Sequence, residues 1–270
     1  MTRLFLAGFY SRHYQLEQSK PPYVLESYHY LLTLNKPNLK TFMDYVLGDQ
    51  CKMFLLDSGA FTYMSQAKNN SKSTIDFDKY VEDYAKFINK YDIKYFFELD
   101  IDAVVGIKKV EQMRRKLERM TGKKSIPVFH KSRGKEYWLK MIKEYDYVAL
   151  GGIAIKDFKQ SEHKTFKWFI DTAHKEGTKV HGLGYTSNKG LNKYPFDTVD
   201  STSWLSASRF GNVDIFDPIQ KKLVKFKPPK NSKTVKDFYK KADLIAVREW
   251  VKYGKHLEKL NSRKVLSWHD

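Results

Sequence analysis

Short runs of β-branched and aromatic residues alternate along this chain with longer segments of helical period, and this alternation limits the possible folds most. It predicts repeated βα units whose strands form a parallel sheet. The expected strands cover residues 4–9, 53–57, 95–100, 126–130, 147–151, 180–184 and 196–200. The chain of 270 residues contains no low-complexity linker, so we expect a single domain spanning residues 1–270.

The expected fold is a TIM-like (β/α)8 barrel. An eighth strand is hard to place, because residues 213–216 and 223–226 flank Asp217-Pro218 and favour a small antiparallel hairpin. The barrel is therefore expected to be irregular at its last strand, with a β-hairpin insertion and basic C-terminal helices. An open doubly wound sheet has the same alternation, and the pattern leaves both architectures open.

The charge of the chain points to a polyanionic partner. Lys and Arg number 49 against 31 Asp and Glu, which gives a net charge of +18. Residues 221–270 carry 15 of these basic residues and only 5 acidic ones. Such an excess attracts nucleic acid and raises its rate of encounter. A solvated, lysine-decorated surface without a partner is the alternative explanation.

Other features favour a soluble cytoplasmic protein. No apolar stretch approaches the ~20 residues that a membrane-spanning helix needs. The first apolar run is interrupted by Arg12-His13-Tyr14 and lacks a cleavage site, so it is expected to be a strand rather than a signal peptide. Cys51 is the only cysteine, which excludes an internal disulfide and a cysteine-rich zinc site.

Polar and glycine residues follow nearly every expected strand. In a strand-helix barrel the carboxyl ends of the strands form the catalytic face. The run from Asp197 to Trp204 places two carboxylates, Asp197 and Asp200, at such an end. A carboxylate there is suited to attack carbon or to hold a cation. An acidic loop that caps the next helix through Asp200 or Ser201 is the simpler alternative.

Four successive strand ends resemble those of the tRNA-guanine transglycosylase superfamily. They are Asp57-Ser58-Gly59-Ala60-Phe61, Gly151-Gly152-Ile153-Ala154, His181-Gly182-Leu183-Gly184 and Asp197-Thr198-Val199-Asp200. The resemblance covers residues 1–218, which we expect to be the catalytic core. Residues 219–270 lie outside it and are expected to form a basic extension that packs on the barrel.

The resemblance implies a role for each matching residue. Asp200 would be the nucleophile and Asp197 a supporting carboxylate, although an alternative register exchanges them. Asp57 would act as acid and base or bind the heterocycle, and Asp100 would recognise the base edge. Base binding is also implied for a further group of residues: Ser58, Gly59, Phe61, Gly151, Gly152, His181 and Gly182. The backbone amides of the two glycines after residue 150 would hold a purine carbonyl.

Two departures from the tRNA enzymes narrow the resemblance. The chain lacks their zinc site of three Cys and a His, so we expect no metal and no cofactor, and it is shorter than they are. Both features are closest to the phage-type 7-deazaguanine DNA transglycosylases, the DpdA group. The implied activity is exchange of guanine in DNA for a 7-deazaguanine base, such as 7-cyano-7-deazaguanine, through a covalent Asp-glycosyl intermediate.

The expected partners are DNA and a free 7-deazaguanine base. Lys131, Arg133 and Arg209 are candidate phosphate contacts, with a solvated loop and a surface ion pair as alternatives. Three other functions remain open: the same exchange on tRNA, a non-catalytic barrel that binds nucleic acid, and a Mg²⁺-dependent phosphate-ester enzyme that uses Asp57, Asp100 and Asp200.

Overall fold

Eight parallel strands form a barrel in the computed structural model, which describes residues 2–60, 62–63, 76–153, 157–227, 238–262 and 265–268. Their order around the barrel is β4-β3-β2-β1-β8-β7-β6-β5. They are β1 (Arg3–Ala7), β2 (Tyr23–Ser27), β3 (Met53–Asp57), β4 (Tyr95–Phe96), β5 (Val128–Phe129), β6 (Tyr147–Leu150), β7 (Lys179–Gly182) and β8 (Thr198–Ser201). A parallel bridge between Phe97 and Ile126 joins the two outer strands of this order. The predicted TIM-like (β/α)8 fold is thus confirmed.

The eighth strand is β2, which the sequence pattern did not reveal. It has only five residues, and Glu26 interrupts its apolar run. The predicted hairpin is confirmed, because β9 (Val213–Asp217) and β10 (Lys222–Phe226) pair antiparallel in a separate sheet. The expected irregularity at the last strand is wrong. It lies instead at β4 and β5, which are only two residues long each.

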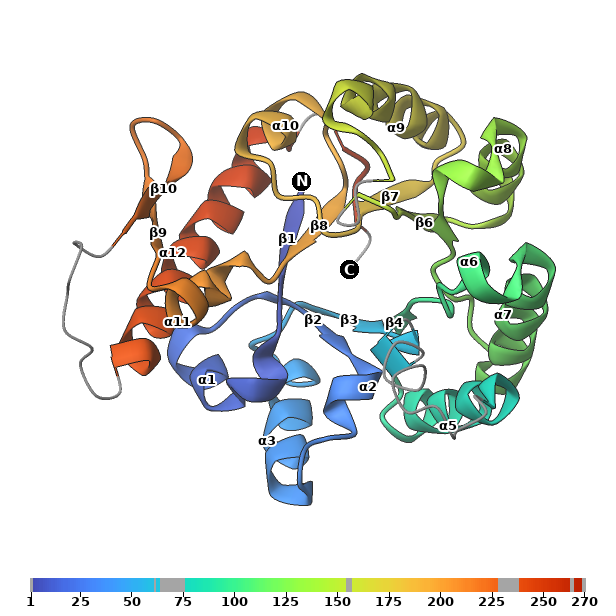
Figure 1. Cartoon of the computed structure of the whole chain (residues 1–270), viewed down its shortest axis with the longest axis horizontal. Coiled ribbons are helices and arrows are strands. Elements are labelled where there is room, and N and C mark those ends of the chain that lie inside the picture. Colours follow the sequence, from blue (N-terminus) through green and yellow to red (C-terminus); the bar gives the residue numbers. More distant parts are fainter. Residues whose placement is uncertain are drawn as a thin grey trace.

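Helices surround the strands on the outside (Figure 1). The longer ones are α3 (Lys36–Val46), α5 (Phe77–Lys90), α7 (Ile107–Thr121), α8 (Lys135–Glu144), α9 (Phe166–Lys175) and α12 (Phe238–Leu260). Short helices occupy loops: α1 (Leu16–Ser19), α2 (Tyr28–Leu31), α6 (Asp102–Val105), α10 (Asn188–Lys193) and α11 (Ser206–Phe210). The 3-10 helices are η1 (Phe9–Ser11), η2 (His13–Gln15), η3 (Lys131–Arg133), η4 (Gln160–Thr165) and η5 (Ser203–Leu205). No helix among the described residues is long and apolar enough to cross a membrane.

The C-terminal region belongs to the barrel. Helix α12 packs on β1, where Gly254 lies against Leu4. The segment after it runs beneath the amino-terminal end of the strands. There the Trp268 ring stacks with the guanidinium of Arg3 at 4.5 Å and meets Tyr147 edge-on at 5.4 Å. The described part of the basic extension therefore supplies the outer helix α12 and a segment whose Trp268 packs at the amino-terminal end of the strands.

Two apolar layers hold the barrel together. Alternate strand residues point inward and form the inner cluster, which includes Phe5, Leu25, Leu55 and Phe97. The residues between them point outward and pack against the helices in a larger cluster. Inward positions beyond the apolar layer, at the carboxyl ends, carry the polar residues of the candidate site.

A buried ionic group closes the barrel between β4 and β5. The Glu98 carboxylate is fully buried and accepts the Val128 backbone N–H at 2.8 Å. It also accepts hydrogen bonds from Arg114 at 3.0 Å and Arg133 at 3.2 Å, whose side chains are 3% and 2% exposed. Because the strands are short here, this side chain supplies a bond that the backbone ladder does not.

Replacing Glu98→Ala should lower the free energy of unfolding by about 3–5 kcal/mol, because Arg114 and Arg133 lose the one fully buried carboxylate that they share. Urea denaturation followed by circular dichroism measures the change. Glu82→Ala is the matched control: Glu82 also pairs with a cation, Lys116 at 2.8 Å, but its side chain is 43% exposed. That variant should lose no more than about 1 kcal/mol. Equal losses in both variants would contradict a closing role for Glu98.

Candidate functional site

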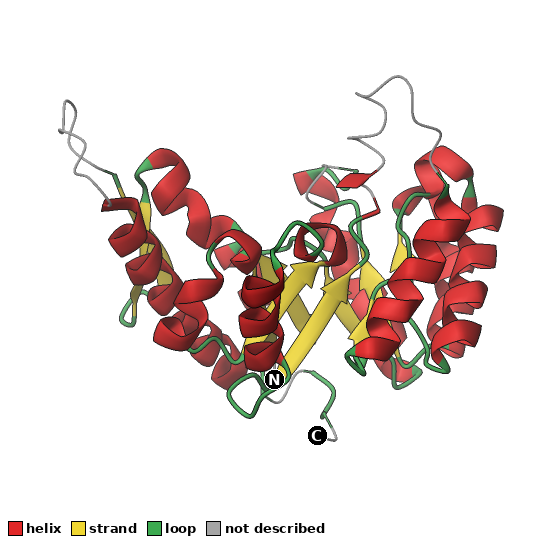
Figure 2. Cartoon of the chain, turned by 90° about the horizontal axis from the view of Figure 1, so that it is seen from below, coloured by secondary structure: helices red, strands yellow, loops and turns green. Residues whose placement is uncertain are grey.

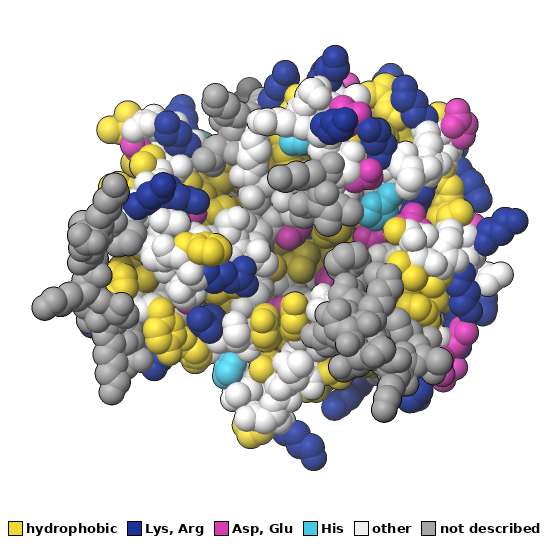
Figure 3. All heavy atoms as spheres, in the orientation of Figure 1, with side chains coloured by type: hydrophobic (Ala, Val, Ile, Leu, Met, Phe, Trp, Pro, Cys, Tyr) yellow, Lys and Arg dark blue, Asp and Glu magenta, His cyan; other side chains and the backbone are white. Residues whose placement is uncertain are grey.

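The carboxyl ends of the strands meet on one face of the barrel. Figure 2 shows the strands pointing to this face and both termini near the opposite end. Side chains that continue the inward-facing positions emerge here, namely Asp57 from β3, His130 after β5 and Asp200 from β8. Figure 3 views the same face and shows acidic and apolar side chains in its central hollow. We call this hollow the mouth.

Asp200 is held by one of its two carboxylate oxygens. Its Oδ1 accepts the Gly184 backbone N–H at 2.6 Å and contacts His181 Nε2 at 3.1 Å. Gly184 has φ of +69°, a left-handed conformation that favours glycine. No described residue donates to Oδ2, and the side chain is 12% exposed. One oxygen is therefore fixed and the other remains available to a ligand.

Asp57 has an environment that favours its protonated form. Burial, together with the negative charges of Asp100 and Asp200, raises its pKa to about 6 against the opposing effect of the Gly59 N–H. The Gly59 N–H donates to Oδ2 at 3.0 Å. Gly59 has φ of +66°, and a Cβ there would lie 2.4 Å from Ser27 Oγ. Only glycine fits this turn beside the carboxylate.

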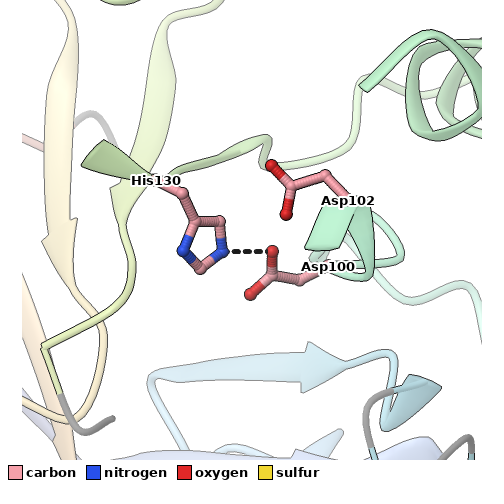
Figure 4. Close-up of side chains that lie close together, drawn as sticks. All are labelled: Asp100, Asp102 and His130. Carbon is pink, nitrogen blue, oxygen red and sulfur yellow. Dashed lines mark hydrogen bonds and ion pairs between the residues drawn. The ribbon is translucent and has the colours of Figure 1, made fainter. Parts of the chain in front are cut away.

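Asp100, Asp102 and His130 converge beside these two carboxylates (Figure 4). His130 Nε2 lies 2.5 Å from Asp100 Oδ1. Burial alone would lower the pKa of His130, but the hydrogen bond and charge of Asp100 outweigh it and raise the pKa above the ordinary value. Arg133 donates from Nε to Asp102 at 2.7 Å. Each carboxylate of this group therefore has a basic partner.

The same three side chains are the candidate metal ligands of the mouth. Among the described residues they alone bring a His and two carboxylates within 4.8 Å of one another. A cation bound there would have to replace the hydrogen bond between His130 and Asp100, and it would lie close to the charge of Arg133. The predicted grouping of Asp57, Asp100 and Asp200 is not the one with this spacing.

The two glycines after β6 differ in their roles. The Gly151 N–H donates to the Phe129 carbonyl at 2.9 Å, so it is not free to hold a purine carbonyl as expected. A Cβ on Gly151 would lie 3.2 Å from the His130 ring, which explains the glycine by packing. Gly152 has φ of +76°, and its N–H has no acceptor among the described residues. That amide remains available to a ligand.

Asp197 does not support Asp200, and this expectation is corrected. Its side chain is fully buried and accepts three hydrogen bonds, from His174 Nε2 at 2.8 Å and from the N–H groups of Val180 at 2.7 Å and Leu266 at 2.9 Å. Residues three apart on a strand face opposite sides. The two carboxylates of the run are thus separated by the sheet, and only Asp200 reaches the mouth.

Other expected site residues have structural partners. Arg133 is buried against Glu98 and Asp102, so it cannot serve as a surface phosphate contact. His181 is fully buried beneath Asp200 and contacts that carboxylate instead of the mouth. A Cβ on Gly182 would meet the Phe196 ring at 3.1 Å on the outer side of the strand, which explains that glycine by packing.

The remaining expected residues divide by exposure. Ser58 is 2% exposed and its hydroxyl accepts the Ala60 N–H at 3.4 Å, which braces the turn after β3. Lys131 and Arg209 are exposed, and Lys131 pairs with Glu162. Phe61 lies outside the described residues.

Glu26 is a buried carboxylate that the sequence did not suggest, and it lies on the outward-facing side of β2, outside the mouth. Its oxygens accept the N–H groups of Ser27 at 2.9 Å and Tyr10 at 2.8 Å. Burial raises its pKa to about 7, against the opposing effect of these hydrogen bonds. A carboxylate inside a strand was the available signal, but β2 had not been recognised as a strand. Asp102 was likewise missed, although it follows Asp100 closely.

Replacement by asparagine should affect stability differently at Asp197 and at Asp200. Both carboxylate oxygens of Asp197 accept hydrogen bonds, so the amide nitrogen of Asp197→Asn must face a backbone or ring N–H. We therefore expect the free energy of unfolding to fall by about 2–4 kcal/mol. Asp200→Asn retains Oδ1 for both donors and places its nitrogen where no donor lies. It should change stability by less than about 1 kcal/mol. Thermal denaturation of both variants provides the measurement, and a reversed order would refute this assignment.

Comparisons with known proteins agree on the fold alone. No protein-family model matches the chain, and no curated protein matches it significantly. A crystal structure from Coccidioides immitis, assigned as a fructose-1,6-biphosphate aldolase, has a TM-score of 0.57 at 9% identity and covers 97% of this chain and 92% of its own. A second structure, described as QR15, an aldolase, has a TM-score of 0.45 at 9% identity, covering 75% of this chain and 90% of its own. At such identity the first match shows a shared barrel architecture.

Proposed function

We propose that this protein is an enzyme of the transglycosylase type, which exchanges guanine in DNA for a free 7-deazaguanine base such as 7-cyano-7-deazaguanine. One observation carries the proposal. Asp200 has one oxygen held by Gly184 and His181 and the other unoccupied among the described residues, and it faces the same mouth as the protonatable Asp57. Enzymes that carry out displacement at a glycosidic carbon commonly use two carboxylates in different environments, one as the nucleophile and the other as the acid and base.

The reaction proceeds by two displacements at C1′ of the nucleotide. Asp200 Oδ2 attacks C1′, the bond from C1′ to N9 breaks, and guanine leaves with a proton supplied by Asp57. The incoming base then loses its N9 proton to a carboxylate and attacks C1′, which releases Asp200. Two inversions retain the configuration of the sugar. No oxidant, reductant or cofactor is required.

The base would be recognised by groups beside these carboxylates. Asp100 is oriented by His130 and offers an acceptor to the N–H groups of a purine edge. The free N–H of Gly152 offers a donor to a purine carbonyl. A guanine in a duplex is out of reach of this mouth, so the enzyme must flip it out or act on unpaired DNA.

The charge distribution suits a DNA substrate. The net charge of +18 attracts a polyanion over distance. Acidic side chains are present in the central hollow of the mouth, whereas exposed Arg209 forms no ion pair among the described residues. Phosphates would thus bind at the rim while the uncharged base enters the acidic centre.

Wild-type protein incubated with labelled 7-cyano-7-deazaguanine and plasmid DNA should transfer the label to DNA, and Asp200→Asn should reduce the transfer at least about 10⁴-fold because the nucleophile is lost. Denaturing electrophoresis of the wild type should also trap a DNA adduct that Asp200→Asn lacks. Asp197→Asn is the matched control at a carboxylate outside the mouth. Label in tRNA alone would redirect the proposal to RNA, and full activity of Asp200→Asn would overturn it.

Release of guanine in a single turnover should slow as the pH rises above about 6, because the protonated form of Asp57 disappears through its raised pKa. Asp57→Asn should lower the rate by about 10²–10⁴ and remove this dependence. The measurement is guanine release from labelled DNA between pH 5 and pH 8. If guanine release by Asp57→Asn still slowed above about pH 6, the pH dependence would belong to another group.

The Asp100, Asp102 and His130 group supports a second candidate, divalent-cation-dependent cleavage of a phosphate ester. The two candidates differ in their response to chelation. Base exchange by Asp200 should be unaffected by EDTA, whereas phosphate-ester cleavage should stop with EDTA and return with added Mg²⁺ or Mn²⁺.

A further inference from the structure

Four polar side chains form a continuous hydrogen-bonded chain inside the barrel. Tyr147 Oη lies 2.5 Å from Thr198 Oγ1, which lies 2.7 Å from His181 Nδ1, and His181 Nε2 lies 3.1 Å from Asp200 Oδ1. Thr198 and His181 are fully buried and Tyr147 is 9% exposed. The chain links β6, β7 and β8 to the carboxylate in the mouth.

The proton positions along this chain follow from its two ends. The carboxylate of Asp200 only accepts, which favours a proton on His181 Nε2, whereas the Thr198 hydroxyl at Nδ1 can donate or accept. In the neutral ring Nδ1 then accepts from Thr198, whose oxygen accepts from Tyr147, and every donor is used. Burial raises the pKa of Tyr147 well above its ordinary value, which keeps that phenol protonated as the first donor.

The other tautomer of the His181 ring, with its proton on Nδ1, would reverse the direction of these hydrogen bonds. Nδ1 would donate to Thr198, and the Thr198 hydroxyl would donate to Tyr147. The Tyr147 hydroxyl proton would then have no acceptor among the described residues. An unsatisfied buried donor costs about 1–3 kcal/mol, so these hydrogen bonds favour the Nε2–H tautomer over the Nδ1–H tautomer.

Packing fixes the rings at both ends of the chain. The Tyr147 ring meets Trp268 edge-on at 5.4 Å beneath the barrel. The His181 ring has Phe97 at 5.3 Å and Phe5 at 6.3 Å, both edge-on. Neither ring can turn to seek another partner without disturbing the inner apolar cluster.

We propose that Tyr147, Thr198 and His181 are positioning residues that lock the Nε2–H tautomer of His181 and hold Asp200 with Oδ2 toward the mouth. Locking of the tautomer stands on these contacts alone. Its catalytic consequence rests on the proposed function, since it aims the nucleophile at the sugar. A purely structural chain would satisfy buried groups without affecting catalysis.

The test removes one hydroxyl and restores it. Thr198→Val keeps the shape of the side chain but cannot donate to Nδ1, whereas Thr198→Ser can. Long-range ¹H–¹⁵N spectra should show His181 as a single neutral Nε2–H tautomer in the wild type and in Thr198→Ser, with the signal assigned by its loss in His181→Gln. Thr198→Val should show a mixture of tautomers.

The kinetics of base exchange provide a second test of the same variants. Thr198→Val should lower kcat for base exchange by about 10–100-fold with KM for the free base unchanged, and Thr198→Ser should recover most of it. Tyr147→Phe, which keeps the ring, should give a smaller effect in the same direction and replaces Thr198→Val if that variant does not fold.

The outcomes distinguish failure of the hydrogen-bonded chain from failure of the proposed function. An unchanged tautomer in both Thr198→Val and Tyr147→Phe overturns the lock, whatever the activity. A changed tautomer with unchanged kcat overturns the positioning role. If wild-type protein shows no base exchange, the proposed function fails, and the tautomer lock is still decided by the spectra.

Discussion

The buried carboxylate of Glu98 is the interaction on which the geometry of this protein depends. It lies at the seam between two strands of only two residues each, and it binds the backbone of one neighbour and two arginines. A barrel open at this point would leave Asp57 and Asp100 on one edge and His130 on the other. Closing the ring brings them to a common mouth.

Arg133 links the ion pair between β4 and β5 to the carboxylates of the mouth. Arg133 pairs with Glu98 inside the wall and with Asp102 at the rim, so one guanidinium serves both. Asp102 in turn lies beside Asp100 and His130. The position of the base-recognising carboxylate in the proposed reaction is thus tied to the same ion pair that closes the barrel.

A strongly basic protein here surrounds an acidic centre. The pKa of Asp57 in the mouth is raised to about 6, mainly by burial. Long-range attraction for a polyanion and short-range proton transfer require opposite charges. On the outer helices many carboxylates are paired with Lys or Arg, whereas Asp57 and Asp200 in the mouth have no Lys or Arg partner among the described residues.

Periodicity in the sequence determined the repeated βα units, seven of the eight strands, the hairpin, and the placement of Asp57, Asp100 and Asp200 at or after strand ends, but it left a closed barrel and an open sheet both possible. These are local properties, since alternation along the chain sets which residues are buried. The strand containing Glu26 was missed because a carboxylate interrupts its apolar run, and the N–H of Tyr10, 16 residues earlier, is one of the two backbone donors that allow this carboxylate to be buried. Only the tertiary structure decided that Asp197 is an outer, structural carboxylate, that Arg133 is buried and that His181 lies beneath Asp200. Such roles depend on which partners closure of the sheet brings together, and no local pattern records them.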